Sequence, residues 1–554
     1  MPVVTIYLNR IMPMLKGSVS VDQLVDNIPF LGLDLEEITD EYLRIEYNPN
    51  RPDYSTDYGL ARGLNGLLGF EVGAPQYKII VGDTEVRIKR SVKKIRPYIV
   101  GLVANHVQFD DESIRQIITM QEDLHNGVGR KRKKVSVGIH NSDVIKYPII
   151  YGTCSQNFRF TPLGERRSFT IKQILEKMDV GIAYGGILMD FENYPLLTDS
   201  RGEVLSFPPI INGDLTKVTS KTKNIFIEIT GTELKSVNNA LSVFAATLHD
   251  LGARLETVKI VDDKSSVNTP NMKPYEFEVN VRLTNKLLGL NLSKAKIIES
   301  LSRSRIDSTL KDGRMVARVP SYRFDIMHQV DLVEEVAIGY GLSRFTLSLP
   351  ESNRVGSLDK KLVTLDVVRN TLSGLGFIEV MNFSLLSRDT LYDKIGRSQS
   401  EVLQVNNPKA GSFEVLRDML LPSLLETLSR NLHEEYPQRI FEVATVFNKE
   451  IDTITGIQEK YHVAVAMAHS QAGYTEAKSY LTSLLANAFG INSKTTPTTS
   501  PIFSQGRTAA VKYGANHIGT VGEVRPGVLE NFHIKMPVAA FELSLDKLIL
   551  SQTL

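Results

Sequence analysis

The sequence predicts a multidomain protein of the α+β class, because it is long and carries two kinds of hydrophobic pattern. Its 554 residues exceed what one hydrophobic core holds, and at about 150 residues per domain they suggest three or four domains. Segments in which apolar and polar residues alternate indicate strands, and segments with apolar residues at helical spacing indicate helices. Both kinds recur along the chain, so we expect mixed α and β domains.

The first predicted domain, residues 1–85, combines a strand with helices. It opens with the alternating segment VVTIYL and continues into a helix that starts near Ser20. It ends in NPNRPDYSTDYGLARGLNG (residues 48–66), a proline-rich turn that leads into a second helix. Ser55 and Thr56 are both suitable N-cap residues, because a hydroxyl oxygen can accept a hydrogen bond from a free helix N–H.

Two further domains precede the C-terminal one. Residues 86–265 alternate strands such as KVSVGIH and NIFIEITGT with helices such as VNNALSVFAATLHDLG. Residues 266–350 contain a predicted strand YEFEVNVRLTNKLLG, a helix SKAKIIESLSRS and a strand pair around the turn KDGR, followed by an acidic segment. A domain as small as this third one buries its apolar face only against neighbours.

The fourth predicted domain, residues 351–554, is rich in long strands. Its helices are predicted over LVTLDVVRNTLSGLG and LPSLLETLSRNLH, and a strand over FIEVMNFSLL lies between them. Further strands follow in RIFEVATVF, YHVAVAMAH, AAVKYG, HIGTVGEV and VAAFELSL. Long strands with few helices predict an antiparallel sheet flanked by helices.

Composition and charge exclude several classes of protein. The formal net charge is only +1, so any contact with nucleic acid must come from a local patch. The single cysteine, Cys154, excludes an intrachain disulfide and a zinc site built from several cysteines. No apolar run approaches the roughly 18 residues of a membrane span, and the start MPVVTIYLNR has no basic segment before its apolar residues. We therefore expect a cytoplasmic protein without membrane contact.

Four carboxylates gather in the segment PSYRFDIMHQVDLVEEVAIGY (residues 320–340), and a metal site, an acid/base pair and a helix cap are all possible. They are Asp325, Asp331, Glu334 and Glu335. Asp331 fits the N-cap of the following helix and Glu334 its N3 position, where the helix dipole favours acids. Four close carboxylates repel one another unless a cation compensates them, and both Mg²⁺ and the guanidinium of Arg323 are suitable. Acid/base chemistry is least expected, because nothing nearby would separate two carboxyl pKa values.

The densest basic cluster is RKRKK, residues 130–134. Such clusters often contact phosphates, but a solvated loop between a helix and a strand explains the charges as well. His125 and His140 flank the cluster, and isolated histidines are more often structural than catalytic. The signatures of phosphate-binding loops and of serine hydrolases are missing from the sequence.

Six long motifs occur in order along the chain. They are NPNRPDYSTDYGLARGLNG (48–66), LHNGVGRKRKKVSVGIHNSD (124–143), VLSFPPIINGD (204–214), FIEITGTEL (226–234), VPSYRFDIMHQVDLVEEVAIGYG (319–341) and LRDMLLPSLLETLSRN (416–431). Through them the chain resembles the beta subunit of phenylalanyl-tRNA synthetase, in its archaeal and eukaryotic form, over essentially its full length.

The resemblance implies a function shared with a partner chain. An alpha subunit would bind ATP and phenylalanine and attach the amino acid to tRNA(Phe), within an (αβ)₂ tetramer. This chain would support that core, help hold the tRNA and hydrolyse mischarged tyrosyl-tRNA(Phe). The resemblance also implies a small winged-helix-like third domain, in which Asp325, Asp331, Glu334 and Glu335 hold Mg²⁺.

For the fourth domain, the resemblance implies a class II synthetase-like fold that has lost its chemistry. A class II core holds ATP phosphates through arginines, one of them in a glycine-rich segment near the end of the domain. The corresponding segment here, VAAFELSLDKLIL (538–550), has neither glycine nor arginine. Without cations at the phosphates, the transition state of adenylation lacks electrostatic stabilisation. We therefore expect an interface in place of a catalyst.

The resemblance places an editing pocket in the second domain. Its residues are Leu197, Ser206, Asn212, Glu228 and Thr230. A pocket that accepts tyrosine and rejects phenylalanine needs a buried polar group for the phenol, and Glu228 can accept that hydrogen bond. Alternation along IFIEITG also allows Glu228 to face solvent. We expect Ser206 and Thr230 to help position the hydrolytic water, because no Cys or Ser–His pair indicates a covalent nucleophile.

Two functions of other classes remain open. The acidic segment would be the centre of a Mg²⁺-dependent hydrolase if its carboxylates carried the chemistry. The RKRKK cluster would define an RNA-binding regulator if binding were sensitive to salt and independent of an alpha subunit.

Overall fold

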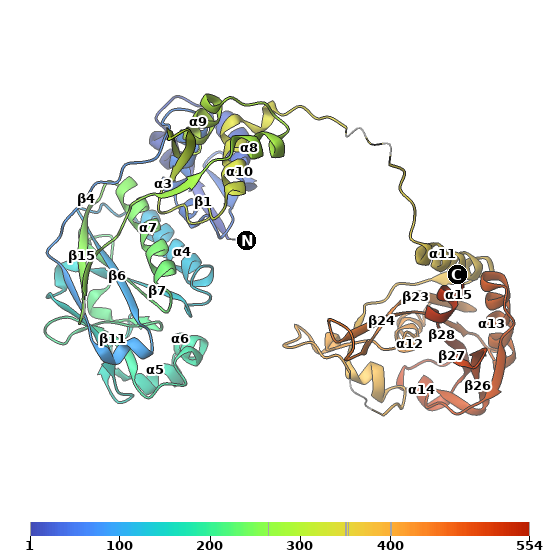
Figure 1. Ribbon diagram of the computed structural model, residues 1–554. Helices are drawn as coiled ribbons and strands as arrows, with labels where there is room; N and C mark the ends of the chain where they lie inside the picture. The colour runs from blue at the N-terminus through green and yellow to red at the C-terminus, as the bar shows by residue number, and fades with distance from the viewer. Residues whose placement is uncertain (1, 264, 350–351, 353, 399–401, 553–554) are drawn as a thin grey trace. The chain divides into compact units, whose positions relative to one another are not determined.

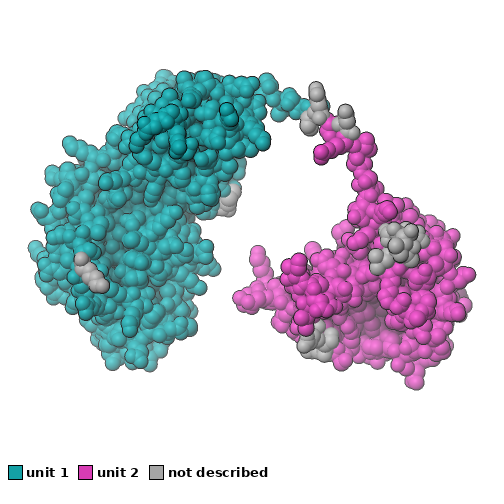
Figure 2. Space-filling view, in the orientation of Figure 1, with its two compact units in different colours: residues 1–349 teal, residues 350–554 magenta. Residues whose placement is uncertain are grey.

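The structure of the chain is a computed structural model that describes residues 2–263, 265–349, 352, 354–398 and 402–552. The chain divides into two compact units, residues 1–349 and 350–554 (Figure 2). The predicted boundary between residues 350 and 351 falls on two residues that lie outside the described part. In that described part, no helix combines the length and apolarity needed to cross a membrane.

The beginning of unit 1 contains a three-stranded antiparallel sheet packed against helices. The elements are β1 (Val3–Tyr7), α1 (Leu8–Ile11), α2 (Val21–Asn27), β2 (Asp34–Ile38), β3 (Tyr42–Glu46) and α3 (Asp57–Leu67), with strand order β1-β3-β2. Ser20 forms a capping box with Gln23 at the predicted start of α2. Thr56 caps α3 by accepting a hydrogen bond from the N–H of Gly59. Ser55, the other candidate, instead donates its hydroxyl to the carbonyl of Pro52.

A long mixed sheet organises residues 79–269 (Figure 1). Its main path runs β13 (Ile211–Asn212), β12 (Val204–Phe207), β11 (Tyr194–Thr198), β8 (Ile149–Cys154), β5 (Glu85–Ile88), β15 (Arg254–Asp262), β6 (Tyr98–Asn105), β14 (Ile225–Gly231) and β7 (Val135–Asn141). Strands β4 (Ile79–Ile80) and β16 (Ser265–Thr269) pair with β15. Helices α4 (Asp111–Asn126) and α7 (Leu234–Asp250) contribute to the core on one face, and α5 (Ile171–Lys177) and α6 (Asp179–Tyr184) lie in a separate cluster.

Strand β14 is buried on both faces, which decides the environment of Glu228. Ile225, Ile227 and Ile229 belong to the core formed with α4 and α7. Phe226 belongs to a different core on the opposite face. Because side chains alternate along a strand, Glu228 shares the face of Phe226, and it is 2% exposed. The alternative that Glu228 faces solvent is therefore wrong.

Residues 275–340 form three strands and three helices. The elements are β17 (Tyr275–Glu278), α8 (Val281–Leu288), α9 (Lys294–Arg303), β18 (Asp307–Lys311), β19 (Arg314–Val319) and α10 (Gln329–Tyr340), with strand order β17-β19-β18. The predicted helix over residues 293–304 and the hairpin at KDGR are confirmed. The predicted strand over residues 275–289 is wrong beyond Glu278. The side chain of Asn280 accepts a hydrogen bond from the N–H of Leu283 and starts a helix there.

Unit 2 contains the predicted sheet flanked by helices. Its strands run in the order β20 (Ile378–Glu379), β23 (Gln438–Lys449), β24 (Ile457–Ala468), β28 (Val538–Ser544), β27 (Asn516–Val524), β26 (Phe503–Tyr513) and β25 (Lys494–Pro497), all antiparallel except the first pair. Helices α11 (Lys360–Gly374), α13 (Tyr474–Phe489) and α15 (Asp546–Gln552) cover one face, and α12 (Leu421–Arg430) and α14 (Pro526–Asn531) the other. The strand predicted over residues 377–386 is interrupted, because Asn382 bonds to Glu442 through its backbone and side chain.

Candidate functional site

A cavity of about 530 Å³ opens in unit 1 between helix α4, strand β7 and the segment of β12 and β13. Ser206, Asn212 and Glu228, three of the predicted editing residues, line it. Phe207, Pro208 and Pro209 contribute apolar surface beside them. The predicted residues Leu197 and Thr230 are fully buried and are not among the lining residues. The structure thus brings three of the five predicted residues to one cavity.

Glu228 is the acidic group of this cavity. Its Oε1 accepts a hydrogen bond of 2.8 Å from the hydroxyl of Ser206, whereas its buried Oε2 has no partner among the described residues. Gly138 lies opposite Glu228 in the pairing of β7 with β14. A Cβ at position 138 would lie 2.5 Å from Glu228 Oε1 and 2.7 Å from His140 Nε2. A Cβ here would therefore force one of these side chains to shift, and the Glu228 carboxylate keeps one free acceptor.

His140, which the sequence suggested to be structural, lies beside Glu228. Its Nδ1 is 2.8 Å from Thr216 Oγ1, and its Nε2 is 3.9 Å from Glu228 Oε1. The Nε2 atom has no hydrogen-bond partner in the described structure, and the imidazole is completely buried. Two neighbouring buried polar atoms, His140 Nε2 and Glu228 Oε2, thus both lack partners. Buried polar groups are normally paired, so such a pair marks a place for a polar ligand group or a water molecule.

His125 reaches the cavity from helix α4, but its ring is already bonded on both sides. Its Nε2 accepts a hydrogen bond of 2.8 Å from the N–H of Val137, and its Nδ1 is 3.2 Å from Glu122 Oε1. An acceptor role for Nε2 places the proton of the neutral ring on Nδ1. Burial is the main cause that lowers the pKa of His125. The imidazole therefore supports the cavity wall as a neutral group.

Thr230 is hydrogen-bonded to Arg96, an arginine that belongs by sequence to the basic cluster but is buried in the structure. The Arg96 Nε donates to Thr230 Oγ1 at 2.9 Å, and its Nη2 donates to the Thr230 carbonyl at 2.8 Å. Its Nη1 donates to the carbonyls of Arg132 and Lys133, both at 3.2 Å. Burial lowers the pKa of Arg96 to about 10, against the opposing effects of Tyr151 and Glu228. Thr230 therefore anchors a guanidinium that also holds the neighbouring loop.

The RKRKK cluster forms a loop with unusual backbone geometry, here called the basic loop (residues 130–134). Arg130, Lys131 and Arg132 have φ values of 47°, 54° and 65°. Each non-glycine residue in this left-handed region costs roughly 1–2 kcal/mol. The loop is fixed by Arg96 and by hydrogen bonds from the N–H groups of Arg132 and Lys134 to the carbonyls of His125 and Gly129. Its conformation is thus specified by the surrounding structure.

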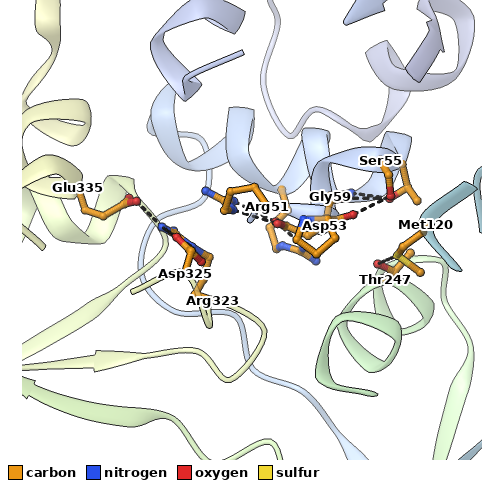
Figure 3. Close-up of polar contacts among 12 residues, drawn as sticks. Arg51, Asp53, Ser55, Gly59, Met120, Thr247, Arg323, Asp325 and Glu335 are labelled. Atoms are coloured by element: carbon orange, nitrogen blue, oxygen red, sulfur yellow. Dashed lines mark hydrogen bonds and ion pairs between the residues drawn. The ribbon is translucent and has the colours of Figure 1, made fainter. Parts of the chain in front are cut away.

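The acidic segment of residues 320–340 is organised around Arg323 (Figure 3). The Arg323 Nε donates to Asp325 Oδ1 at 3.0 Å and its Nη2 to Asp325 Oδ2 at 2.8 Å. The same Nη2 forms an ion pair with Glu335. The Arg323 side chain is 2% exposed, and those of its two partners are 11% and 10% exposed. A guanidinium already compensates these two carboxylates.

Asp331 and Glu334 have other environments. Helix α10 begins at Gln329, so Asp331 is at N3. The prediction that Asp331 is the N-cap is wrong by three residues. Asp331 Oδ2 instead accepts hydrogen bonds of 2.7 Å from the N–H groups of Met327 and His328, the residues just before the helix. Desolvation, then the charges of Glu335 and Asp331, raise the pKa of Glu334.

The four carboxylates do not fit Mg²⁺ as they lie. Within the described residues, no group of three or more His, Cys, Asp or Glu side chains is placed to hold a metal ion. Arg323 occupies the position between Asp325 and Glu335 in which a cation would be needed. The Mg²⁺ site therefore stays a prediction.

The acidic segment adjoins the proline-rich turn of the first predicted domain (Figure 3). Arg51 and Asp53 form two hydrogen bonds of 2.9 Å, and Arg62 lies 3.3 Å from Asp53. Residues from both segments, among them Arg51, Arg62 and Arg323, line one small cavity. Burial alone would raise the pKa of Asp53, but the arginines outweigh it and lower the pKa to about 2. This buried network joins two segments that are far apart in the sequence.

Comparisons with known proteins match almost the whole chain. The family models are described as B3/4 domain, tRNA synthetase B5 domain and phenylalanyl tRNA synthetase beta chain CLM domain, at residues 86–247, 277–342 and 346–545. A phenylalanine–tRNA ligase beta subunit from Archaeoglobus fulgidus is 36% identical over 549 residues, covering 99% of this chain and 98% of its own. One from Thermococcus kodakarensis is 37% identical over 552 residues, covering 96% of each chain.

A solved structure agrees with these sequence matches. It is an N-terminal fragment of the phenylalanyl-tRNA synthetase beta subunit from Pyrococcus horikoshii, with a TM-score of 0.59 and 35% identity. The match covers 61% of this chain and 100% of the fragment. The domains therefore place the chain in the class of tRNA synthetase subunits. Within that class, the chain belongs to the family of phenylalanyl-tRNA synthetase beta subunits, as its sequence motifs predicted.

Proposed function

We propose that the chain is the beta subunit of a phenylalanine–tRNA ligase and that its cavity hydrolyses mischarged tyrosyl-tRNA(Phe). The observation that carries the second part is the free Oε2 of Glu228 in the cavity beside Ser206 and Asn212. A phenol would donate its hydrogen bond to this oxygen. Phenylalanine would leave it unpaired, and sites built around such a bond reject the analogue that lacks it by about 10⁴–10⁵-fold.

The residues around Glu228 have different roles in binding the substrate and in its hydrolysis. Ser206 donates a hydrogen bond to Glu228, so this hydroxyl orients the carboxylate. Hydrolysis requires a water molecule to attack the ester carbonyl, with the tRNA 3′ oxygen as the leaving group. Asn212 lines the cavity with an amide that can donate and accept hydrogen bonds. Thr230 supports the cavity indirectly by holding Arg96, because its hydroxyl accepts a hydrogen bond from that guanidinium.

The test compares Glu228→Ala and Glu228→Gln in the complex with the alpha subunit from the same source. Loss of a hydrogen bond to a charged group costs about 1.5–3 kcal/mol, so Glu228→Ala is expected to lower kcat/KM for tyrosyl-tRNA hydrolysis by roughly 10- to 150-fold. Glu228→Gln keeps an acceptor oxygen and is expected to fall between. Phenylalanine charging serves as the control and should be unchanged in both variants. Equal hydrolysis of tyrosyl- and phenylalanyl-tRNA by the unchanged complex would contradict the proposal.

For the ligase reaction, the chain has a supporting role in an (αβ)₂ tetramer, in which the alpha subunit binds ATP and phenylalanine. In the proposed class II synthetase-like domain, Glu542 lies on β28, the strand expected to supply phosphate-binding cations. Its carboxylate accepts hydrogen bonds from the N–H groups of Leu420 and Leu421 and contacts His462 Nδ1 at 2.7 Å. A carboxylate here disfavours a phosphate. The lone chain should therefore show no phenylalanine-dependent pyrophosphate exchange, and robust exchange would refute this role.

The proposal also includes a winged-helix-like arrangement for residues 266–350 and a cytoplasmic location for the complex. The observed three helices and three short strands support the first of these. A Mg²⁺-dependent hydrolase centred on the acidic segment has less support, since Arg323 already neutralises two of its carboxylates.

A further inference from the structure

We propose that the basic loop holds the phosphates at the 3′ end of the tRNA whose aminoacyl group enters the cavity. The inference rests on the proposed editing function and names the part of the protein that would hold its substrate. It starts from the position of Arg132, which belongs both to the basic loop and to the wall of the cavity. The basic loop therefore adjoins the cavity.

Arg132 attaches the basic loop to the wall of the cavity, and its charge is paired with Glu122. Its Nη1 donates to the carbonyl of Ile210 at 2.9 Å and its Nη2 to Glu122 Oε1 at 3.0 Å. Its guanidinium also lies over the ring of Tyr184, 4.4 Å from the centroid. Ile210 and Glu122 both line the cavity. Arg132 thus has a structural role and is not available for a ligand.

The cations on either side of Arg132 differ from it in exposure and in ion pairing. Arg130, Lys131 and Lys133 are exposed, and none has an ion-pair partner within 4 Å among the residues that the structure describes. Lys134, by contrast, pairs with Glu233 at 3.1 Å. Three exposed cations without an ion pair within 4 Å lie within four residues and form a local positive patch on a chain whose net charge is only +1. An anionic polymer is the partner that such a patch favours.

The backbone of the loop argues against an ordinary solvated turn. Three successive non-glycine residues in the left-handed region persist only where the surroundings determine them, and such residues cluster at functional sites. Here the carbonyls of Arg132 and Lys133 are fixed by the buried guanidinium of Arg96. The loop therefore presents its three exposed cations from a defined backbone.

Size and chemistry determine which part of the RNA would lie on the loop. A cavity of about 530 Å³ accepts an amino acid and the sugar to which it is esterified, but not several nucleotides. The phosphates that precede this sugar must then lie outside, at the edge where the basic loop is. Lys and Arg contacts to a single strand release counterions, and each contributes about 0.7 to the slope of log K against log salt concentration.

The experiment uses the full chain in complex with its alpha subunit and the triple variant Arg130→Gln/Lys131→Gln/Lys133→Gln. Two substrates are compared: tyrosyl-tRNA(Phe), and tyrosine esterified to the 3′ hydroxyl of adenosine, which has no phosphate. Losing three contacts should lower the salt slope for the tRNA by about 2. Between about 50 and about 200 mM salt, kcat/KM of the unchanged complex should thus fall roughly 20-fold more than that of the variant. Hydrolysis of the adenosine ester should be unaffected.

A matched control removes the same charge elsewhere in unit 1. Lys286, Lys294 and Lys311 are exposed, and their triple Gln variant should retain the salt slope of the unchanged complex. The inference is overturned if the loop variant hydrolyses tyrosyl-tRNA with an unaltered salt slope. It is also overturned if the variant loses hydrolysis of both substrates equally, since the loop would then only build the cavity. If the unchanged complex hydrolyses neither substrate, the proposed editing function itself fails.

Discussion

Replacing Arg323 by methionine should strongly destabilise unit 1. The change removes a guanidinium that is 2% exposed and leaves Asp325 and Glu335 buried without their cation. Methionine fills a similar apolar volume, so the loss reflects charge more than packing. Removing one partner from a buried ion pair typically costs about 3–5 kcal/mol. Two carboxylates lose their partner here, so we expect a loss in the upper part of that range.

The assay is urea unfolding of the full chain, followed for unit 1 by a fluorescent label. Arg44→Met is the matched control, because Arg44 is 45% exposed and its carboxylate partners are 3.5 Å away. Such surface pairs contribute about 0–1 kcal/mol. The triple variant Arg323→Met/Asp325→Asn/Glu335→Gln should recover much of the loss, because no buried charge remains unpaired. A loss below about 1 kcal/mol for Arg323→Met would refute the assignment of Arg323 as the internal cation.

Three other predictions follow from the described contacts. Gly138→Ala should displace the Glu228 carboxylate, reduce tyrosyl-tRNA hydrolysis and destabilise the fold by about 1–3 kcal/mol through overpacking. Gly186→Ala is the control, because a Cβ at position 186 meets nothing within 4 Å. It should leave both hydrolysis and stability unchanged. Asp53 has a folded pKa of about 2 against an ordinary value of 3.8. Its ionisation therefore contributes about 2 kcal/mol to the free energy of unfolding above pH 4, and this contribution is lost as the pH falls toward 2. The difference in unfolding free energy between the unchanged chain and Asp53→Asn should shrink over that interval in acid titrations. Chelation of divalent cations should leave the unfolding free energy of the unchanged chain the same, and a loss on chelation, reversed by Mg²⁺, would establish the metal site predicted for Asp331 and its neighbours.

The sequence predicted the start of a helix correctly where only one nearby residue could serve as its N-cap. Ser20 begins α2 as expected, but the choice between Ser55 and Thr56 depended on which hydroxyl the turn had already used. Asn280 was overlooked because the preceding residues continue the alternating pattern of a strand. At the acidic segment, Asp331 stabilises the helix from N3 and not from the N-cap. The sequence thus revealed which residues can cap a helix, but not which position of the helix each one occupies.

The cavity shows which part of a site the sequence alone leaves unknown. Ser206, Asn212 and Glu228 were identified through family motifs, and they meet in the structure. The positions of His140 and Gly138 beside Glu228 follow only from the register that pairs β7 with β14. Arg96 lies 134 residues from Thr230, and no periodicity in the sequence connects them. Contacts across such separations depend on tertiary packing, which local patterns do not encode.

Every residue that lines the cavity lies between Phe109 and Glu228, within a single compact unit. The chemistry proposed for the cavity therefore needs no wall from residues 350–554. Under the proposed function, substitutions that abolish proofreading by altering the cavity lining would fall within residues 109–228, and substitutions in residues 350–554 would leave that lining unchanged.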